Sequence, residues 1–133
     1  MQQYLNLATV KGRLAARSGK VSTQVPALSS APAGKFGMAV TTLDGTTCVA
    51  GDSAEPFSIQ SLSKLFGLCA LLQRDAAAWE HVGWEPTDSN YGSVAELERA
   101  HGRPRNPFVN PGALVVTDRL IEHTGNAAAA TIE

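Results

Sequence analysis

The chain has 133 residues, of which 44% are hydrophobic and 17% are charged, and its formal net charge is −1 at pH 7. This length suits one small domain, and the composition is that of a soluble globular protein rather than a disordered one. The near-neutral charge gives no electrostatic reason to expect binding to nucleic acid or to an anionic surface. No apolar run in the sequence approaches the length of a membrane-spanning helix.

The first segment, residues 3–17, places apolar residues among polar ones at helical spacing. This pattern predicts a weak amphipathic helix that Gly12 interrupts and that ends at Ser18-Gly19. No acidic residue occurs before Asp44, whereas several lysines and arginines do. Because a basic segment without acids is also typical of transit peptides, a targeting role is an alternative interpretation.

The next segments predict a β-hairpin. Residues 21–34 are rich in Pro, Ser and Ala, which indicates an extended connection. Residues 36–43 then alternate apolar and small side chains, as a half-buried strand does. Asp44-Gly45 is a strong hairpin turn signal, and residues 46–50 supply the returning strand.

Residues 60–74 predict the central helix of the protein. Its apolar residues extend around most of the helix circumference, which is typical of a helix buried in a core. Near its start, Ser61 and Lys64 lie three residues apart, so their side chains share one face. We therefore expect Lys64 to be buried, which is unusual for a lysine and needs an explanation.

Ser61 and Lys64 together suggest nucleophilic catalysis. A serine hydroxyl is a weak nucleophile unless an adjacent base takes its proton. A lysine that acts as this base near neutral pH needs a pKa about 3 units below normal, and burial shifts the pKa in that direction. Backbone N–H groups at a helix N-terminus can also stabilise an oxyanion. The same spacing arises by chance in chains of this length, so alone it is only a hypothesis.

The rest of the chain predicts further helices. Two short ones are expected over residues 75–82 and 94–100. Asn110-Pro111 then opens a longer helix, because Asn is a preferred cap and Pro a preferred first helical residue. Gly125 suits the position just past its end. Residues 127–133 show no pattern that predicts another element.

The two cysteines, Cys48 and Cys69, fit neither a CxxC motif nor a disulfide framework. Both occupy positions that we interpret as apolar, so we expect buried free thiols and a reducing compartment, the cytoplasm. The three histidines are scattered and form no metal-ligand pattern.

Four stretches of the sequence, in order and at coherent spacing, match motifs of one known family. They are Lys35-Phe-Gly-Met-Ala-Val40 with Asp44-Gly45, Phe57-Ser-Ile-Gln-Ser-Leu-Ser-Lys64, Val82-Gly-Trp-Glu-Pro86, and Gly102-Arg-Pro-Arg-Asn-Pro-Phe-Val-Asn-Pro-Gly-Ala113. Together they resemble the serine-dependent glutaminases over roughly residues 19–120. This is most of the chain but well under half of a family member.

The resemblance implies an α+β fold like that of the serine β-lactamases and transpeptidases. Residues 1–133 would be the N-terminal portion of a glutaminase domain: the first β-hairpin of an antiparallel sheet, the nucleophile-bearing helix and a helical subdomain. The implied reaction is hydrolysis of the L-glutamine side-chain amide to L-glutamate and ammonia, with no metal or cofactor. Ser61 would form an acyl-enzyme, Lys64 would accept the Ser61 proton, and Ser61 and Asn110 would hold the substrate. The resemblance also implies a homo-oligomer, either a dimer or a tetramer.

For Asn110 the residues alone leave two roles open, a helix cap and a substrate ligand. Asn106 is expected to be structural and to fix the turn before Pro107. The sequence also departs from the family: Gln24 replaces a pocket tyrosine, Tyr91-Gly92 replaces Phe-Asn, and Pro111 replaces an alanine. The glutamate, second asparagine and two tyrosines that complete the family's site would lie beyond residue 133.

Two alternatives follow. A truncated, inactive glutaminase-like chain that only associates with other subunits is one, since strand edges left unpaired favour association. A penicillin-recognising enzyme is the other, because it also uses Ser-x-x-Lys. That class needs a later Ser-x-Asn and a Lys-Thr-Gly, whereas Asp88-Ser89-Asn90 has the wrong order and no lysine follows Lys64.

Overall fold

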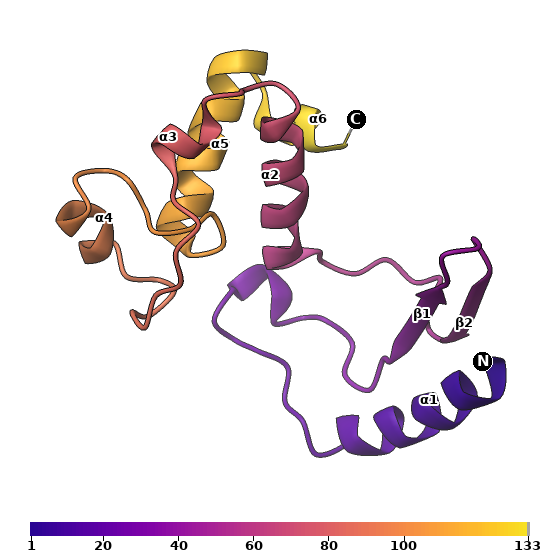
Figure 1. The fold of residues 1–133 in the computed structure, drawn as a ribbon. Coiled ribbons are helices and arrows are strands. Elements are labelled where there is room, and N and C mark those ends of the chain that lie inside the picture. The colour runs from indigo at the N-terminus through magenta and orange to yellow at the C-terminus, as the bar shows by residue number, and fades with distance from the viewer. Residues whose placement is uncertain (133) are drawn as a thin grey trace. The chain divides into compact units, whose positions relative to one another are not determined.

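The computed structural model describes residues 1–132, which form two compact units, residues 1–58 and 59–132 (Figure 1). The first unit contains helix α1 (Gln2–Ala16), the 3-10 turn η1 (Pro26–Leu28) and strands β1 (Gly37–Thr41) and β2 (Thr47–Gly51). The second contains the 3-10 turn η2 (Gln60–Leu62) and helices α2 (Ser63–Leu72), α3 (Ala78–His81), α4 (Ala95–Arg99), α5 (Asn110–Thr124) and α6 (Ala127–Ile132). The protein is therefore of the α+β class, as expected.

The predicted hairpin is confirmed. Strands β1 and β2 pair antiparallel, in a register that runs from Gly37 opposite Gly51 to Thr41 opposite Thr47. In the connecting turn, Gly45 adopts a φ of 85°, a conformation that glycine tolerates without steric cost. The Asp44 carboxylate accepts the backbone N–H of Thr46 at 3.0 Å, so local chemistry alone closes this turn.

Helix α1 packs along the hairpin within the first unit (Figure 1). The helix continues through Gly12, so the predicted interruption is wrong. A Cβ atom at Gly12 would lie 2.5 Å from the Phe36 ring, which shows that this glycine is required for a close approach of the ring to the helix. Arg13 also forms an ion pair with Asp52 at 2.9 Å, which ties the helix to the end of the hairpin.

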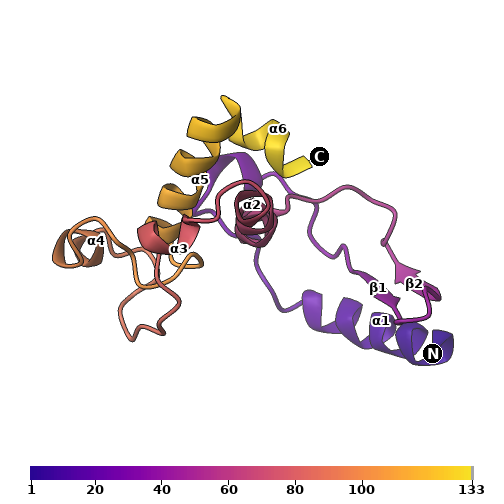
Figure 2. The ribbon, with the colours of Figure 1, turned by 45° about the horizontal axis from the view of Figure 1, so that its top comes forward.

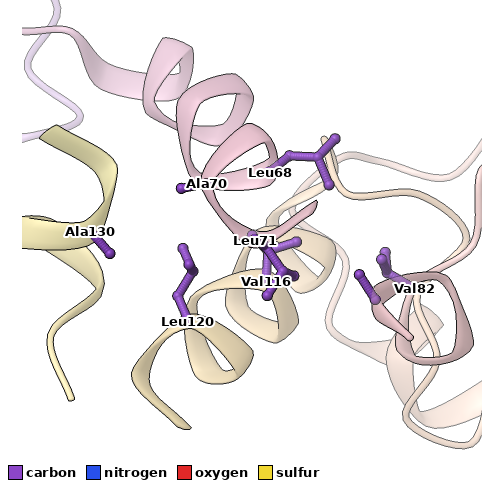
Figure 3. Close-up of a cluster of buried hydrophobic side chains, with 8 residues drawn as sticks. Leu68, Ala70, Leu71, Val82, Val116, Leu120 and Ala130 are labelled. Carbon is purple, nitrogen blue, oxygen red and sulfur yellow. The ribbon is translucent and has the colours of Figure 1, made fainter. Parts of the chain in front are cut away.

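The second unit has its core where α2, α5 and α6 meet (Figure 2). The buried apolar side chains of this core are Leu68, Ala70, Leu71, Ala78, Val82, Val116, Leu120 and Ala130 (Figure 3). Our expectation of no element after residue 127 is wrong over residues 127–132, and Glu133 lies outside the described residues. Alanine is the best helix former, and the Asn126 side chain accepts the Ala129 N–H at 3.1 Å as a cap does.

Helix α2 is covered less completely than predicted. Leu71 is fully buried, but Leu65 and Phe66 expose 47% and 49% of their surface. In the second unit α5 and α6 pack on α2, and they leave its other apolar residues exposed. Cys69 belongs to this exposed set and Cys48 is half-buried, so the prediction of two buried thiols is wrong.

A buried carboxylate braces the turn after α2 against α5. Asp75 accepts hydrogen bonds from Arg119 Nε at 3.1 Å and Nη2 at 2.9 Å, and from the Ala77 backbone N–H at 2.9 Å. His123 Nε2 lies 3.3 Å from the same carboxylate. The hydrogen bonds from Arg119 are the largest influence on the pKa of Asp75 and hold it below its ordinary value. No helix of residues 1–132 is long and apolar enough to cross a membrane.

Candidate active site

Ser61 and Lys64 lie on consecutive helical turns, as predicted. Ser61 is the middle residue of η2, and Lys64 is in the first turn of α2. Residues three apart in a helical segment lie on one face, so the continuous run from η2 into α2 places Ser61 and Lys64 on the same face. Ser61 is exposed. The backbone N–H groups of Gln60 and Ser61 open the helical segment and so have no intrahelical acceptor.

Lys64 is held by two acceptors from the loop that precedes α5. Its Nζ donates to the Phe108 carbonyl oxygen at 2.8 Å and to Asn110 Oδ1 at 2.7 Å. Lys64 is half-buried rather than buried, because the exposed side of α2 leaves part of its side chain open to solvent. Among the hydrogen bonds of the described residues, none joins Lys64 Nζ to Ser61 Oγ.

Asn110 does not cap the helix, so that prediction is wrong. Val109 occupies the cap position, Asn110 is the first residue of α5, and α5 has no side-chain cap hydrogen bond. The side-chain oxygen Oδ1 of Asn110 instead accepts a hydrogen bond from Lys64, which lies 46 residues earlier in the chain. Its backbone N–H donates to the Tyr91 carbonyl oxygen at 2.7 Å. This leaves Pro111 as the second helical residue, where the missing N–H costs nothing.

The loop before α5 is fixed by Asn106, whose structural role is confirmed. Its side-chain oxygen accepts the backbone N–H groups of Phe108 at 3.0 Å and Val109 at 3.2 Å. Its Nδ2 donates to the Glu85 carbonyl oxygen at 3.0 Å. A Cβ atom at Gly112 would lie 2.0 Å from the Asn106 carbonyl oxygen, so α5 and this loop are in direct backbone contact. These contacts fix both acceptors of Lys64.

An open groove runs beside Lys64 between α2, α5 and α6, with a volume of about 680 Å³. Its walls are mostly apolar and include Phe66, Val116 and Ile132, while Ser63, Lys64 and Thr117 supply polar atoms. No pattern in the sequence predicted this groove, because most of its lining residues come from α5 and α6. In the part of the chain that the structure describes, no cluster of His, Cys, Asp or Glu could hold a metal ion.

The structure thus defines an α+β protein in which a Ser-x-x-Lys segment spans η2 and the start of α2. The lysine of this segment donates a hydrogen bond to an asparagine at the start of α5. The family model of the glutaminases matches residues 19–133, and the chain belongs to the glutaminase family. It is 53% identical over 112 residues to the glutaminase of Streptomyces coelicolor, covering 84% of this chain and 36% of that protein. It is 50% identical over 109 residues to the glutaminase of Shewanella putrefaciens, covering 80% of this chain and 36% of that protein.

Solved structures agree with this assignment. The crystal structure of Mglu in its glutamate form superposes with a TM-score of 0.81 and 31% identity, covering 99% of this chain and 31% of that chain. The probable glutaminase of Bacillus subtilis gives a TM-score of 0.71 and 29% identity, covering 90% of this chain and 36% of that chain. The chain therefore spans about a third of the length of the relatives that it matches.

Proposed function

We propose that this chain is the nucleophile-bearing portion of a glutaminase, which hydrolyses the side-chain amide of L-glutamine to L-glutamate and ammonia. The observation that carries the proposal is the 2.7 Å hydrogen bond from Lys64 to Asn110, next to Ser61 in a Ser-x-x-Lys segment. In this proposal Ser61 is the nucleophile, Lys64 is the base, and Asn110 and Ser61 bind the substrate.

The two acceptors of Lys64 suit the role of a base. A neutral amine has two N–H donors and one lone pair, so the Phe108 carbonyl and Asn110 Oδ1 can take both donors. The lone pair is then the one remaining direction on the nitrogen, and it is available to the Ser61 hydroxyl on the same face. The two hydrogen bonds of Lys64 therefore support a proton transfer from Ser61 to the lone pair of Lys64.

The acyl-transfer steps follow from these assignments. Ser61 Oγ attacks the amide carbon while its proton passes to Lys64, and the lysine returns a proton to the leaving ammonia. The Ser61 backbone N–H, which has no intrahelical acceptor, stabilises the oxyanion. Water then hydrolyses the acyl-enzyme to release glutamate. Asn110 Nδ2 offers N–H donors to the substrate while its Oδ1 remains on Lys64.

The fold, compartment, cofactor requirement and oligomeric state of the protein are proposed on the same basis. Residues 1–133 form the N-terminal portion of a glutaminase domain with a fold like the serine β-lactamases and transpeptidases. The protein is cytoplasmic, works without metal or cofactor and forms a dimer or tetramer. A second candidate is a chain that is inactive alone and only associates with other subunits. The exposed apolar residues of α2 and the coverage of about a third of its relatives favour this candidate.

One experiment separates the two candidates. The purified chain is incubated with L-glutamine, released ammonia is measured, and Ser61 is tested by mass spectrometry for reaction with a fluorophosphonate, a serine-directed electrophile. An enzyme releases ammonia and is labelled at Ser61, and Ser61→Ala abolishes both signals. Ser58→Ala is the matched control, because it removes a neighbouring serine outside the Ser-x-x-Lys spacing. Absence of ammonia release and of labelling in the parent chain would favour the second candidate.

A further inference from the structure

We propose that Gln60 and Ser63 form a brace that positions Ser61, and that Gln60 and Ser63 are therefore positioning residues for the proposed reaction. This inference rests on the proposed function, since it assigns Ser61 as the nucleophile. It is carried by a backbone conformation at Gln60 and by two hydrogen bonds that converge on the Gln60 carbonyl oxygen.

Gln60 has an unfavourable backbone conformation directly before the nucleophile. Within residues 1–132 only two residues other than glycine have a positive φ, Gln60 at 46° and His101 at 50°. His101 precedes Gly102 in an ordinary turn at the end of α4, whereas Gln60 precedes Ser61. Left-handed backbone is disfavoured for residues with a Cβ atom. Such residues persist only where their surroundings hold them, and they cluster at active sites.

Ser63 holds Gln60 in this backbone conformation. Its hydroxyl donates to the Gln60 carbonyl oxygen at 2.7 Å, and its backbone N–H donates to the same oxygen. The Gln60 carbonyl and the Ser61 N–H belong to one planar peptide unit and point in opposite directions. Fixing the carbonyl therefore fixes the direction of the Ser61 N–H. In the proposed reaction this N–H is the oxyanion donor, so the brace orients the nucleophile and its oxyanion site together.

A serine hydroxyl that bonds to the carbonyl three residues earlier is also a common local arrangement at helix ends. If that were its whole role, loss of the hydroxyl would lower stability without changing the reactivity of Ser61. A positioning role predicts instead that loss of the hydroxyl lowers the reactivity of Ser61 more than it lowers stability. The test therefore measures Ser61 reactivity and Gln60 conformation separately from the free energy of unfolding.

Four variants of the full chain make the test. Ser63→Ala removes the donor, while Ser63→Thr keeps a hydroxyl that can bond to the same carbonyl. Gln60→Val adds a β-branched residue that resists positive φ, while Gln60→Gly adopts it freely. Gln73→Val is the matched control, because Gln73 caps the C-terminus of α2 with a φ of −74°. The readouts are the rate of fluorophosphonate labelling at Ser61 and the distance between the amide and α protons of residue 60 by NMR, which is short when φ is positive.

We expect Ser63→Ala and Gln60→Val to slow labelling of Ser61 by about a hundredfold, the cost of a misplaced reacting group. In both variants the short proton distance in residue 60 should lengthen. Ser63→Thr, Gln60→Gly and Gln73→Val should label within a few-fold of the parent chain. Labelling at the parent rate in Ser63→Ala or Gln60→Val, or an unchanged proton distance in Ser63→Ala, would overturn the brace.

The two proposals fail in different ways. If the parent chain is not labelled at Ser61, the second candidate, a chain that is inactive alone, is favoured, and the proton distance alone then decides whether Ser63 holds Gln60. If Ser63→Ala does not fold, the contrast between Gln60→Val and Gln60→Gly decides the outcome. Equal labelling rates and equal stabilities in that pair would overturn the proposal.

Discussion

Lys64 Nζ lies 2.7 Å from Asn110 Oδ1 and so joins the first turn of α2 to the first residue of α5. This contact removes the helix-cap explanation of Asn110, because its side-chain oxygen is already engaged by the lysine. It also brings two candidate site residues that lie 46 positions apart in the sequence into one hydrogen bond.

Replacement of Lys64 by arginine should abolish reaction at Ser61. The variant keeps the positive charge, but a guanidinium does not lose its proton in proteins and cannot act as a base. Fluorophosphonate labelling and, where turnover is measurable, acyl-enzyme formation by rapid quench are the readouts. Lys20→Arg, at an exposed position, is the control and should behave as the parent chain does. Undiminished acylation in Lys64→Arg would exclude Lys64 as the base.

The contact between Lys64 and Asn110 should be measurable as a coupling energy. We expect Asn110→Ala to lower the free energy of unfolding by about 1 kcal/mol, the usual net value of a hydrogen bond. Lys64→Met removes the same contact from the other side. In a double-mutant cycle by urea unfolding, the coupling should reach at least about 0.5 kcal/mol. Strictly additive effects would show that the two side chains do not interact in solution.

Two helix glycines should respond oppositely to alanine. At Gly112 the new Cβ atom would lie 2.0 Å from the Asn106 carbonyl oxygen and 2.8 Å from Pro107 Cα, so the backbone must shift. We expect Gly112→Ala to cost about 3 kcal/mol, as severe overpacking does, and to reduce labelling of Ser61 by displacing Asn110.

Gly67→Ala is the matched control, because its Cβ atom would meet only Val116 and Leu120 at 3.8 and 3.9 Å, which is ordinary contact. Helix propensity should make this variant neutral or up to about 1 kcal/mol more stable than the parent. Chemical unfolding of both variants decides the comparison. Equal destabilisation of the two would contradict the backbone contact at Gly112.

Stability should fall in acid because of Asp75. Arg119 holds the pKa of Asp75 below its ordinary value in the folded state. The carboxylate therefore contributes stability above the unfolded pKa of an aspartate, and this contribution is lost as pH falls through the lower, folded pKa. Melting temperatures between pH 2 and 6 should fall less steeply for Asp75→Asn, which is already less stable at pH 7. Identical pH profiles for the two proteins would contradict this role.

The chain in isolation should be oligomeric or prone to aggregation. Leu62 in η2, Leu65 on α2 and Leu114 on α5 expose 56%, 47% and 62% of their surface. Exposed apolar surface drives association. Size-exclusion chromatography should show less of the associated species for Leu62→Lys with Leu65→Lys than for the parent. Leu71→Lys is the contrasting control, since it places a charge in the core and should prevent folding. A stable parent monomer would contradict this expectation.

The sequence by itself determined the elements whose cause is local. Asp44-Gly45 closes the hairpin through its own carboxylate and a glycine of positive φ, and Gly125 ends α5 with a φ of 73°. The spacing of Ser61 and Lys64 likewise places them on one face, because helical periodicity alone decides it. Family motifs in residues 35–113 predicted the glutaminase family, which the match over residues 19–133 confirms.

Only the tertiary structure decided features that depend on what lies opposite a residue. Gly12 does not break α1 but allows the Phe36 ring to occupy the space that a side chain would need. Asn110 accepts from Lys64 rather than capping its own helix, since the loop fixed by Asn106 places its side chain there. The exposure of Cys69 follows from the sides of α2 that α5 and α6 leave uncovered. Propensity and spacing describe neighbours along the chain, whereas these outcomes depend on packing between segments far apart in it.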